Sequence, residues 1–411
     1  YHMVSSYDIF YVIAIRGELK PIDIVRALNK SKDEYQTIFN KILELEKNSY
    51  IKRDNNIKIV HNERSIKLFN LISFCIRNSI NYNLMLKKTM LEFLEKASKK
   101  EFFTIKNIKI HPQTFNFYTM LLSKYGFLLI TSRKPLRCKL LRHYFLIDLM
   151  KFFSRDSKFY IPKQQDFINE IKKELKKYKR NLKIHYNIIK DLDKKQEANF
   201  IYSSLNLEGN PLTLPETQKL ILEDIIPEKY KLNYINEVTN YKKAVDLMIE
   251  NAENRVILDL NLILNYHRIA MQHIHGSGEF RKQNVRIKLN PNFKTCDWQL
   301  IPLKINELIK KYEDFEVKKR NIKEIIDFAS FFHNEFQRIH PFIDGNSRTS
   351  RLLMLHILRS HGIPILDLPL GYFDLYLDLT KRSTKRDDES FKYLIEEIVL
   401  ANLKKINNMV T

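Results

Sequence analysis

Apolar residues recur at intervals of three and four along most of this chain, which is the spacing of helices that bury one face. The pattern is clearest in Asn321–Ile339 and Ser350–Gly362, and the second stretch ends at a glycine, as helices often do. Apolar and polar residues alternate in Tyr50–Val60, around a turn of Asp and Asn at positions 54–56, which indicates two short strands. The pattern therefore predicts a mainly α-helical protein with few strands.

The segment between the two helical stretches, HPFIDGNSRTSR at positions 340–351, concentrates more reactive side chains than any other part of the chain. Pro341 disfavours helical geometry at the residue before it, so it predicts an extended His340 and helps to end the first helix. The small residues of the DGN sequence then turn the chain into the second helix. We therefore expect a loop that stands at the start of a helix.

Such a loop is suited to bind an anion, because the first backbone N–H groups of a helix lack internal partners and carry partial positive charge. Gly345 lets a phosphate approach the backbone, and Arg348 and Arg351 lie on one face of the helix, where they can bind more phosphate oxygens. Asp344 offers an oxygen ligand suited to Mg²⁺. His340 can act as a general base near neutral pH. Together these groups predict the transfer of a phosphorus-containing group.

The same segment resembles the signature of the Fic family, whose pattern is H-x-F-x-D/E-G-N-G-R-x-x-R. It departs from the pattern at Ser347, where the AMP-transferring members have glycine. The resemblance extends over about Ile161–Thr411 and implies a Fic-type helical core with a small β-hairpin flap. The flap corresponds to His273–Ile287 and would dock the target protein. Its matching residues are Gly278, Phe280 and Arg281.

A second stretch, Phe200–Thr213, resembles the inhibitory motif of the same family, S/T-x-x-x-E-G/N, with Ser204, Glu208 and Gly209 at the matching positions. The resemblance implies a self-inhibited class with an inhibitory helix near residues 198–210, ahead of the core. Glu208 would pair with Arg351 and keep ATP from binding productively. Without the resemblance, Ser204 and Glu208 would read as a solvated helix face that ends in a glycine cap.

The activity that the resemblance implies is protein adenylyltransfer, the transfer of AMP from ATP to a Ser, Thr or Tyr hydroxyl of a protein target. Asp344 would hold Mg²⁺, and His340 would take the proton from the hydroxyl. Some relatives also remove AMP with the inhibitory glutamate, which extends the expectation to Glu208. The residues expected to bind the nucleotide are Phe342, Gly345, Asn346, Ser347, Arg348 and Arg351.

Two alternatives stay open at this point. Ser347 adds a Cβ and a hydroxyl beside the anion site, which could invert the nucleotide and make the enzyme a kinase or another phosphorus-group transferase. The chain could instead be a DNA-binding regulator whose Fic core only senses nucleotide. His340 argues against the second alternative, because a sensor needs no base.

Length and composition favour an intracellular protein of two or three domains. We place the domains at 1–62, 63–160 and 161–411. The three cysteines are far apart in the sequence and suggest neither a disulfide framework nor a zinc site. No stretch approaches the roughly 20 apolar residues of a membrane span. We therefore expect a cytoplasmic location and no membrane partner.

The net charge of +22 is concentrated in the N-terminal part, since residues 1–160 hold 29 Lys and Arg against 14 Asp and Glu. Such asymmetry suggests a polyanionic partner. Residues 1–62 read as three helices and a basic hairpin, which resembles a winged helix-turn-helix, a fold that binds DNA or docks proteins. The exposed candidates are Lys32, Gln36, Thr37 and Lys41 on the third helix and Lys52, Arg53 and Lys58 on the wing.

Residues 63–160 fit either a second winged helix, with Phe127–Arg137 as its strand and basic loop, or a helical connector. Tyr372 and Tyr376 fit either the adenine pocket or the core. A homodimer contact through the Fic core, or a ligand at the N-terminal domain, would be able to move the Glu208 helix and relieve inhibition.

Overall fold

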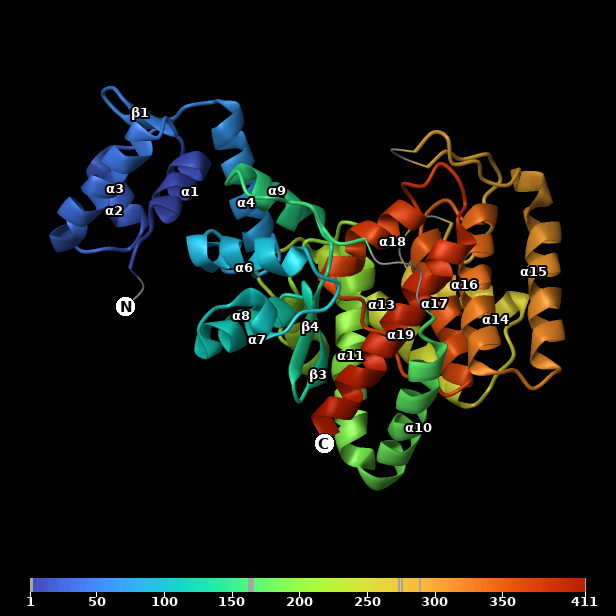
Figure 1. Ribbon diagram of the computed structural model, residues 1–411. Coiled ribbons are helices and arrows are strands. Elements are labelled where there is room, and N and C mark those ends of the chain that lie inside the picture. Colours follow the sequence, from blue (N-terminus) through green and yellow to red (C-terminus); the bar gives the residue numbers. More distant parts are fainter. Residues whose placement is uncertain (1–2, 162–165, 273, 275, 288–289, 411) are drawn as a thin grey trace. The chain divides into compact units, whose positions relative to one another are not determined.

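The structure is a computed structural model that describes residues 3–161, 166–272, 274, 276–287 and 290–410. Its regular elements are mostly helices, with two short antiparallel hairpins in the described part of the chain (Figure 1). Contacts divide the chain into two compact units, Tyr1–Tyr118 with Tyr144–Tyr160 and Thr119–His143 with Ile161–Thr411. The mainly α-helical fold class predicted from the sequence pattern is confirmed.

The first unit begins with three helices and a hairpin, in the order that the sequence predicts. These elements are α1 (Ser6–Arg16), α2 (Pro21–Ala27), η1 (Lys32–Glu34), α3 (Tyr35–Lys47), β1 (Ile51–Arg53) and β2 (Ile57–Ile59). Ser5 and Asp8 form a capping box at the start of α1, and Ile38, Ile42 and Leu45 form the buried face of α3. The turn at 54–56 joins the two strands, and Leu19 bridges to Ile57. Its assignment as a winged helix stays a prediction.

The rest of the first unit is helical. Its elements are α4 (Glu63–Arg77), α5 (Tyr82–Met85), α6 (Lys88–Ser98), α7 (Ile105–Ile108), part of α8 (Pro112–Lys124) and α9 (Tyr144–Phe152). Phe93, Phe103 and Phe115 are almost completely buried and pack edge-on or tilted against one another. These aromatic contacts hold α6 and α8 together around a small core.

The hairpin of β3 (Leu128–Arg133) and β4 (Leu136–Leu140) belongs to the second unit, although the sequence analysis placed all of 63–160 in one segment. β3 packs on the last helix of the chain, α19 (Asp388–Val410). The Gly371 N–H donates to the Gly126 carbonyl oxygen at 2.8 Å, and Lys139 pairs with Glu397. These contacts along the hairpin explain why it groups with the C-terminal elements.

Helices make up the rest of the second unit. They are α10 (Ile168–Ile184), α11 (Tyr186–Asn206), α12 (Leu214–Leu222), α13 (Leu232–Glu253), α14 (Leu260–Ala270), η2 (Trp298–Leu300), α15 (Ile301–Glu316), α16 (Ile322–Ile339), α17 (Asn346–Ser360), η3 (Leu370–Tyr372) and α18 (Phe373–Leu379). Helix α17 packs against α13, α14 and α16. Its residues 346–358 are all buried. Burying polar groups costs free energy unless they have hydrogen-bond partners, so the buried polar first turn of α17 needs such partners.

The flap predicted over His273–Ile287 contains no strand in its described residues, and residues 273 and 275 lie outside that part of the chain. Its only pairing there is an isolated bridge between Ile287 and Asn290. Gly276 and Gly278 both have positive φ, which interrupts an extended run. The Arg281 side chain donates to the backbone carbonyl oxygens of His340 and Gln283.

In the part of the chain that the structure describes, no helix is both long and apolar enough to cross a membrane. Cys75 and Cys138 are buried and Cys296 is partly buried, and all three are free thiols.

Candidate active site

His340 ends α16 in a left-handed conformation, with φ 52° and ψ 58°. The extended conformation predicted from Pro341 is therefore wrong. The proline excludes the right-handed helical region for the residue before it, and the left-handed region still lets the His340 N–H bond to the Phe336 carbonyl oxygen at 2.9 Å and cap the helix. A non-glycine residue held in this region is locally strained, and such strain often marks a functional site.

Gly345 begins α17 with φ +80°, and no larger residue fits there. A Cβ at this position would lie 2.7 Å from the Met271 side chain and 3.1 Å from the His267 Nε2 atom. The loop is also braced from within, since the Phe342 N–H donates to Asn346 Oδ1 at 2.9 Å and Asn346 Nδ2 donates to the Phe342 carbonyl oxygen at 2.8 Å. Phe342 and Asn346 thus shape the loop that presents the start of α17.

His267 ties this loop to the flap segment. Its Nδ1 accepts from the Gly278 N–H at 2.8 Å, so its Nε2–H donates to the Asp344 carbonyl oxygen at 2.9 Å. The ring also stacks on Phe342 with 3.5 Å between centroids. Burial lowers the pKa of His267 to about 4, which keeps the ring neutral and preserves both bonds at neutral pH.

Arg281 of the flap segment is buried and turned towards the catalytic loop. The backbone N–H of Arg281 donates to the Pro341 carbonyl oxygen at 2.9 Å, and the side-chain Nε donates to the His340 carbonyl oxygen at 2.8 Å. Its guanidinium also donates to the carbonyl oxygens of Gln283 and Cys296 and, at 3.5 Å, to Asn284 Oδ1 and the Ile339 carbonyl oxygen. Phe280 beside it is half-buried and packs against Phe342. Arg281 therefore fixes the backbone on which His340 stands.

The His340 side chain is set up to receive a proton. Its Nδ1–H donates to the Gln337 carbonyl oxygen at 3.2 Å, which leaves the lone pair on Nε2. Burial lowers the pKa of His340 to about 4. The hydrogen bond to Gln337 opposes this shift, and the positive charges of Arg281 and Lys381 add smaller contributions to it. The ring is therefore neutral at physiological pH, the form that a general base requires.

The two arginines of the α17 start are buried but are satisfied to different degrees. Arg348 is 4% exposed and pairs with Asp344 at 3.1 Å, while its Nε is buried and has no hydrogen-bond partner among the residues that the structure describes. The Asp344 side chain is 60% exposed. A buried guanidinium donor without an acceptor is costly, so this position favours a bound anion.

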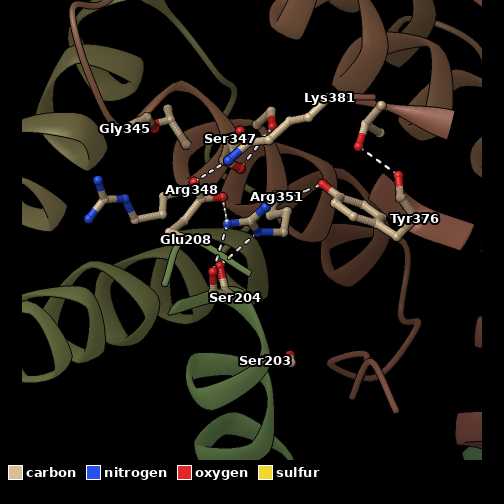
Figure 2. Close-up of polar contacts among 12 residues, drawn as sticks. Ser203, Ser204, Glu208, Gly345, Ser347, Arg348, Arg351, Tyr376 and Lys381 are labelled. Carbon is tan, nitrogen blue, oxygen red and sulfur yellow. Dashed lines mark hydrogen bonds and ion pairs between the residues drawn. The ribbon is translucent and has the colours of Figure 1, made fainter. Parts of the chain in front are cut away.

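Each of the three guanidinium nitrogens of Arg351 donates at least one hydrogen bond (Figure 2). Its Nε donates to Ser204 Oγ at 2.7 Å, and one terminal nitrogen donates to the Ser204 carbonyl oxygen and to Glu208 Oε1, both at 2.9 Å. The other terminal nitrogen donates to the Tyr376 hydroxyl at 3.4 Å. Ser204 and Glu208, which are four positions apart in the sequence, thus both bond directly to Arg351.

Glu208 lies in the turn that follows α11, not within a short helix, and Gly209 after it has φ +94°. Its carboxylate is 17% exposed and touches two cations, Arg351 through Oε1 and Lys381 through Oε2. Burial by itself would raise the pKa of Glu208, but the charges and hydrogen bonds of Arg351 and Lys381 outweigh it and lower the pKa to about 2. Glu208 is therefore charged at any physiological pH.

Tyr376 orients Arg351 through a chain of hydrogen bonds. Because His333 Nδ1–H donates to Asn334 Oδ1 at 2.9 Å, its Nε2 accepts from the Tyr376 hydroxyl at 2.8 Å. Asn334 in turn donates to Asp388 at 2.9 Å. Tyr376 thus belongs to a buried polar network and is not simply part of the core.

Sequence reasoning missed Lys381 and this network. Lys381 follows α18, 173 positions after Glu208, and no spacing rule links the two. The one available signal for the network was His333, which lies two helical turns before His340.

Comparison with known proteins shows which family the chain resembles. A sequence model of the Fic/DOC family matches residues 257–358. The chain is 27% identical over 210 residues to "Protein adenylyltransferase Fic" of Drosophila mojavensis, covering 49% of this chain and 40% of that protein. It is 28% identical over 208 residues to the protein of the same name from Drosophila grimshawi, covering 49% and 42%. The chain thus spans less than half the length of these curated relatives.

Two solved structures share the fold. A Fic domain containing signaling protein from Bacteroides thetaiotaomicron VPI-5482 has a TM-score of 0.52 at 20% identity, over 59% of this chain and 97% of that one. Fic-1 (residues 134–508) from C. elegans has a TM-score of 0.50 at 17% identity, over 60% of this chain and 71% of that one.

Proposed function

This chain contains a Fic domain, and on that premise we propose that it is a protein adenylyltransferase, held inactive by Glu208, that moves AMP from ATP to a hydroxyl group of a protein. The observation that carries the proposal is the buried start of α17, where Arg348 has a buried donor without an acceptor among the described residues, eight positions after the neutral ring of His340. A polyphosphate would supply the acceptors, and the ring would take the proton of the attacking hydroxyl.

Each of these residues would have a role in one transfer step. The phosphates of ATP would lie at the start of α17, where the first backbone N–H groups of the helix lack helical partners and Arg348 and Arg351 would bind terminal oxygens. His340 Nε2 would accept the proton of the target hydroxyl as its oxygen bonds to the α-phosphorus. The bond from that phosphorus to the bridging oxygen then breaks, and pyrophosphate leaves with the electron pair.

Mg²⁺ would be held by Asp344 together with the phosphates. The described residues contain no group of three or more His, Cys, Asp or Glu side chains that could bind a metal without help, and an exposed single carboxylate fits an ion that keeps waters and shares substrate oxygens. When bound, the ion would neutralise phosphate charge. The protein target would dock beside the flap residues Gly278, Phe280 and Arg281.

Inhibition follows from competition for Arg351. While Glu208 occupies Arg351, the terminal phosphate of ATP has no access to that guanidinium in its productive position. Glu208 could also serve the reverse reaction by activating water to remove AMP. Its pKa of about 2 makes it a weak base while both cations hold it, so removal would require those cations to have turned to other ligands.

Ser347 supports one other candidate, the transfer of the γ-phosphoryl group by an inverted nucleotide. Its side chain is buried in the first turn of α17, where a glycine would leave more room. This alternative differs from the first only in which phosphorus is attacked, so one experiment separates them.

The test incubates the Glu208→Gly variant and Mg²⁺ with ATP labelled at the α or the γ position, with Glu208→Gly/His340→Ala as the control. We expect protein label from the α position only, lost in the control. Label from the γ position only would establish a kinase. The absence of both, with ATP still bound, would leave the nucleotide-sensing regulator as the better interpretation.

A further inference from the structure

Lys381 is the second cation on the inhibitory carboxylate, and no part of the inhibitory motif or the signature predicts it. It follows α18, and its ammonium pairs with Glu208 Oε2 while Arg351 holds Oε1 (Figure 2). The Glu208 carboxylate therefore bridges two positive groups that come from different elements. A bridge of this kind positions both cations for a ligand with oxygens at a similar spacing.

Both cations lose their counter-ion when Glu208 leaves. The Arg351 side chain is 3% exposed and the Lys381 side chain is 32% exposed, so water compensates Lys381 only in part. Two neighbouring positive groups in a partly dry site then favour an anion with more than one charged oxygen. The terminal phosphates of a nucleoside triphosphate have this character, whereas the single phosphate of AMP offers fewer oxygens.

The charge of Lys381 also contributes, after burial and the charge of Arg281, to the lowered pKa of His340, so Lys381 adds to the positive potential at the expected base. Lys381 is thus connected to both the inhibitory glutamate and the expected base. An exposed lysine that only happened to meet Glu208 would have no such relation to the reaction centre.

The backbone around Lys381 is held without the ammonium. Asn290 Nδ2 donates to the carbonyl oxygens of Lys381 and Ser383 at 2.7 and 2.8 Å, and the Arg382 N–H donates to the Leu377 carbonyl oxygen at 2.8 Å. Thr380 Oγ1 also donates to the Tyr376 carbonyl oxygen at 2.6 Å. Removal of the charge should therefore leave the segment in place, which makes Lys381 suitable for a charge-deletion test.

We propose that Lys381 is a phosphate-binding residue of this site, specific for the β- and γ-phosphates of a nucleoside triphosphate, and that the Glu208 carboxylate occupies it in the inhibited state. The inference rests on the proposed function and deepens it. Glu208 then blocks two phosphate ligands at once, and ATP must displace the carboxylate from both. Lys381 consequently has opposite effects in the two states, because it stabilises the inhibitory contact and also binds the nucleotide that replaces it.

The test measures the binding of ATP and AMP, each with Mg²⁺, by calorimetry on the full chain. Lys381→Met is made in the wild type and in Glu208→Gly, with Lys381→Arg as the conservative variant. The matched control is Lys385→Met, which removes the same charge from an exposed position four residues on. Circular dichroism checks that each variant keeps its helix content.

In the Glu208→Gly background we expect Lys381→Met to weaken ATP binding about tenfold and AMP binding less than about twofold, while Lys381→Arg and Lys385→Met change neither by more than about twofold. In the wild type the loss in ATP affinity should be smaller, because the same change also loosens Glu208. The two backgrounds should therefore give different effects for one substitution.

Unchanged ATP affinity of Glu208→Gly/Lys381→Met would overturn the inference, and so would an equal loss in Lys385→Met, which would indicate a general charge effect. A further result would also overturn the inference: Lys381→Met speeds AMP transfer in the wild type and changes nothing in Glu208→Gly. Lys381 would then only hold Glu208 and would not bind phosphate. If Glu208→Gly binds ATP but transfers no AMP, the proposed function fails while the binding comparison still decides on Lys381. If Glu208→Gly does not bind ATP, both proposals fail.

Discussion

The two compact units differ in how deeply some of their charged side chains are buried. In the first unit the basic residues of the hairpin lie at the surface beside acids, as Arg53 does with Glu46 at 2.6 Å and Lys58 with Glu18 at 3.4 Å. In the second unit Arg281, Arg348 and Arg351 are at most 4% exposed. Exposed pairs contribute about 0–1 kcal/mol each, whereas an unpaired buried charge costs several kcal/mol. Buried charge therefore has to be matched in detail, by protein or by ligand.

This difference shows that net charge and chemistry need not coincide in one chain. Residues 1–160 hold most of the net charge of +22, yet the groups that are poised for a reaction are in the C-terminal unit. Substitutions of single charges should therefore have large effects in the second unit and small ones in the first. The first three experiments below compare a residue of the second unit with a counterpart in the first, and the fourth compares two residues of the first unit.

The largest effect is expected from Arg351→Ala in the Glu208→Gly background. Loss of an arginine that binds the transferring phosphates lowers rates by about 10³-fold or more, and this arginine is fixed by Tyr376 and Ser204 in the structure. The initial rate of AMP incorporation measures it, with Arg53→Ala as the counterpart, for which we expect a rate within about twofold of the parent. A loss of less than about tenfold in Arg351→Ala would contradict the role given to this residue.

The next comparison uses two glycines with nearly equal φ, +84° for Gly17 and +80° for Gly345. A Cβ at Gly17 meets no atom within 4 Å, whereas a Cβ at Gly345 lies 2.7 Å from Met271. Gly17→Ala should lower the free energy of unfolding by about 1–2 kcal/mol through backbone conformation alone, and Gly345→Ala by about 2–4 kcal/mol because strain and overpacking add.

Denaturant unfolding distinguishes these two substitutions when a separate signal is read for each unit. Trp298, the single tryptophan of the chain, lies in the second unit, so its fluorescence follows Gly345→Ala. Because circular dichroism reports the helices of both units, Gly17→Ala is followed in the part of that signal that does not change together with Trp298 fluorescence. Equal losses would mean that the Met271 side chain moves away at little cost. The proposed close fit of the loop at Gly345 would then be wrong.

Much of the site was predictable because its residues are neighbours in the sequence. His340, Asp344, Arg348 and Arg351 lie within twelve positions, and a loop before a helix brings them together whatever the rest of the fold does. The helices on either side follow from apolar spacing, and their predicted ends lie close to those observed. Local sequence thus fixes local chemistry when the element that carries it is short.

The parts that were missed depend on contacts between distant segments. Nothing near Lys381 indicates that it meets Glu208, and the left-handed His340 depends on Arg281, which lies 59 positions earlier and holds the carbonyl oxygen of His340. The described residues of the flap segment likewise contain no strand, and its Arg281 bonds to the carbonyl oxygen of His340 in the catalytic loop. Tertiary contacts of this kind override local preference.

A third prediction concerns acid stability. Burial lowers the pKa of His333 to about 3 and that of His356 to about 4, so both rings stay neutral in the folded state while the unfolded chain binds their protons below about pH 6.5. The stability of the second unit should therefore fall as the pH decreases from about 6.5 to 4, by up to about 1.4 kcal/mol per pH unit for each ring.

The measurement is the free energy of unfolding from Trp298 fluorescence between pH 4 and 8. His356→Gln should flatten the dependence on pH, although it lowers stability at neutral pH through the lost bonds to Tyr266 and Val256. His111→Gln, an exposed residue of the first unit, should leave the curve unchanged. A curve for His356→Gln that is parallel to that of the wild type would show that His356 does not contribute to the acid sensitivity.

The smallest effect is expected in the first unit, where the predicted DNA contact is still untested. The wing lysines already pair with Asp54, at 3.8 Å for Lys52 and 3.4 Å for Lys58, so a nucleic acid would have to compete with that carboxylate. The exposed Lys32, before α3, is then the better phosphate ligand of the set. Lys32→Ala should weaken duplex DNA binding about two- to fivefold at low salt and lower the slope of log affinity against log salt by about 0.9.

Fluorescence anisotropy of a labelled duplex measures this, with Lys99→Ala as the control in the same unit, since Lys99 pairs with Asp156 at 3.3 Å. AMP transfer should be the same in both variants, because neither residue touches the site. Equal weakening by both would mean that the duplex responds to total charge, and the assignment of α3 as a recognition helix would be wrong. A loss confined to Lys32→Ala would identify duplex DNA as a ligand for the surface charge of the first unit.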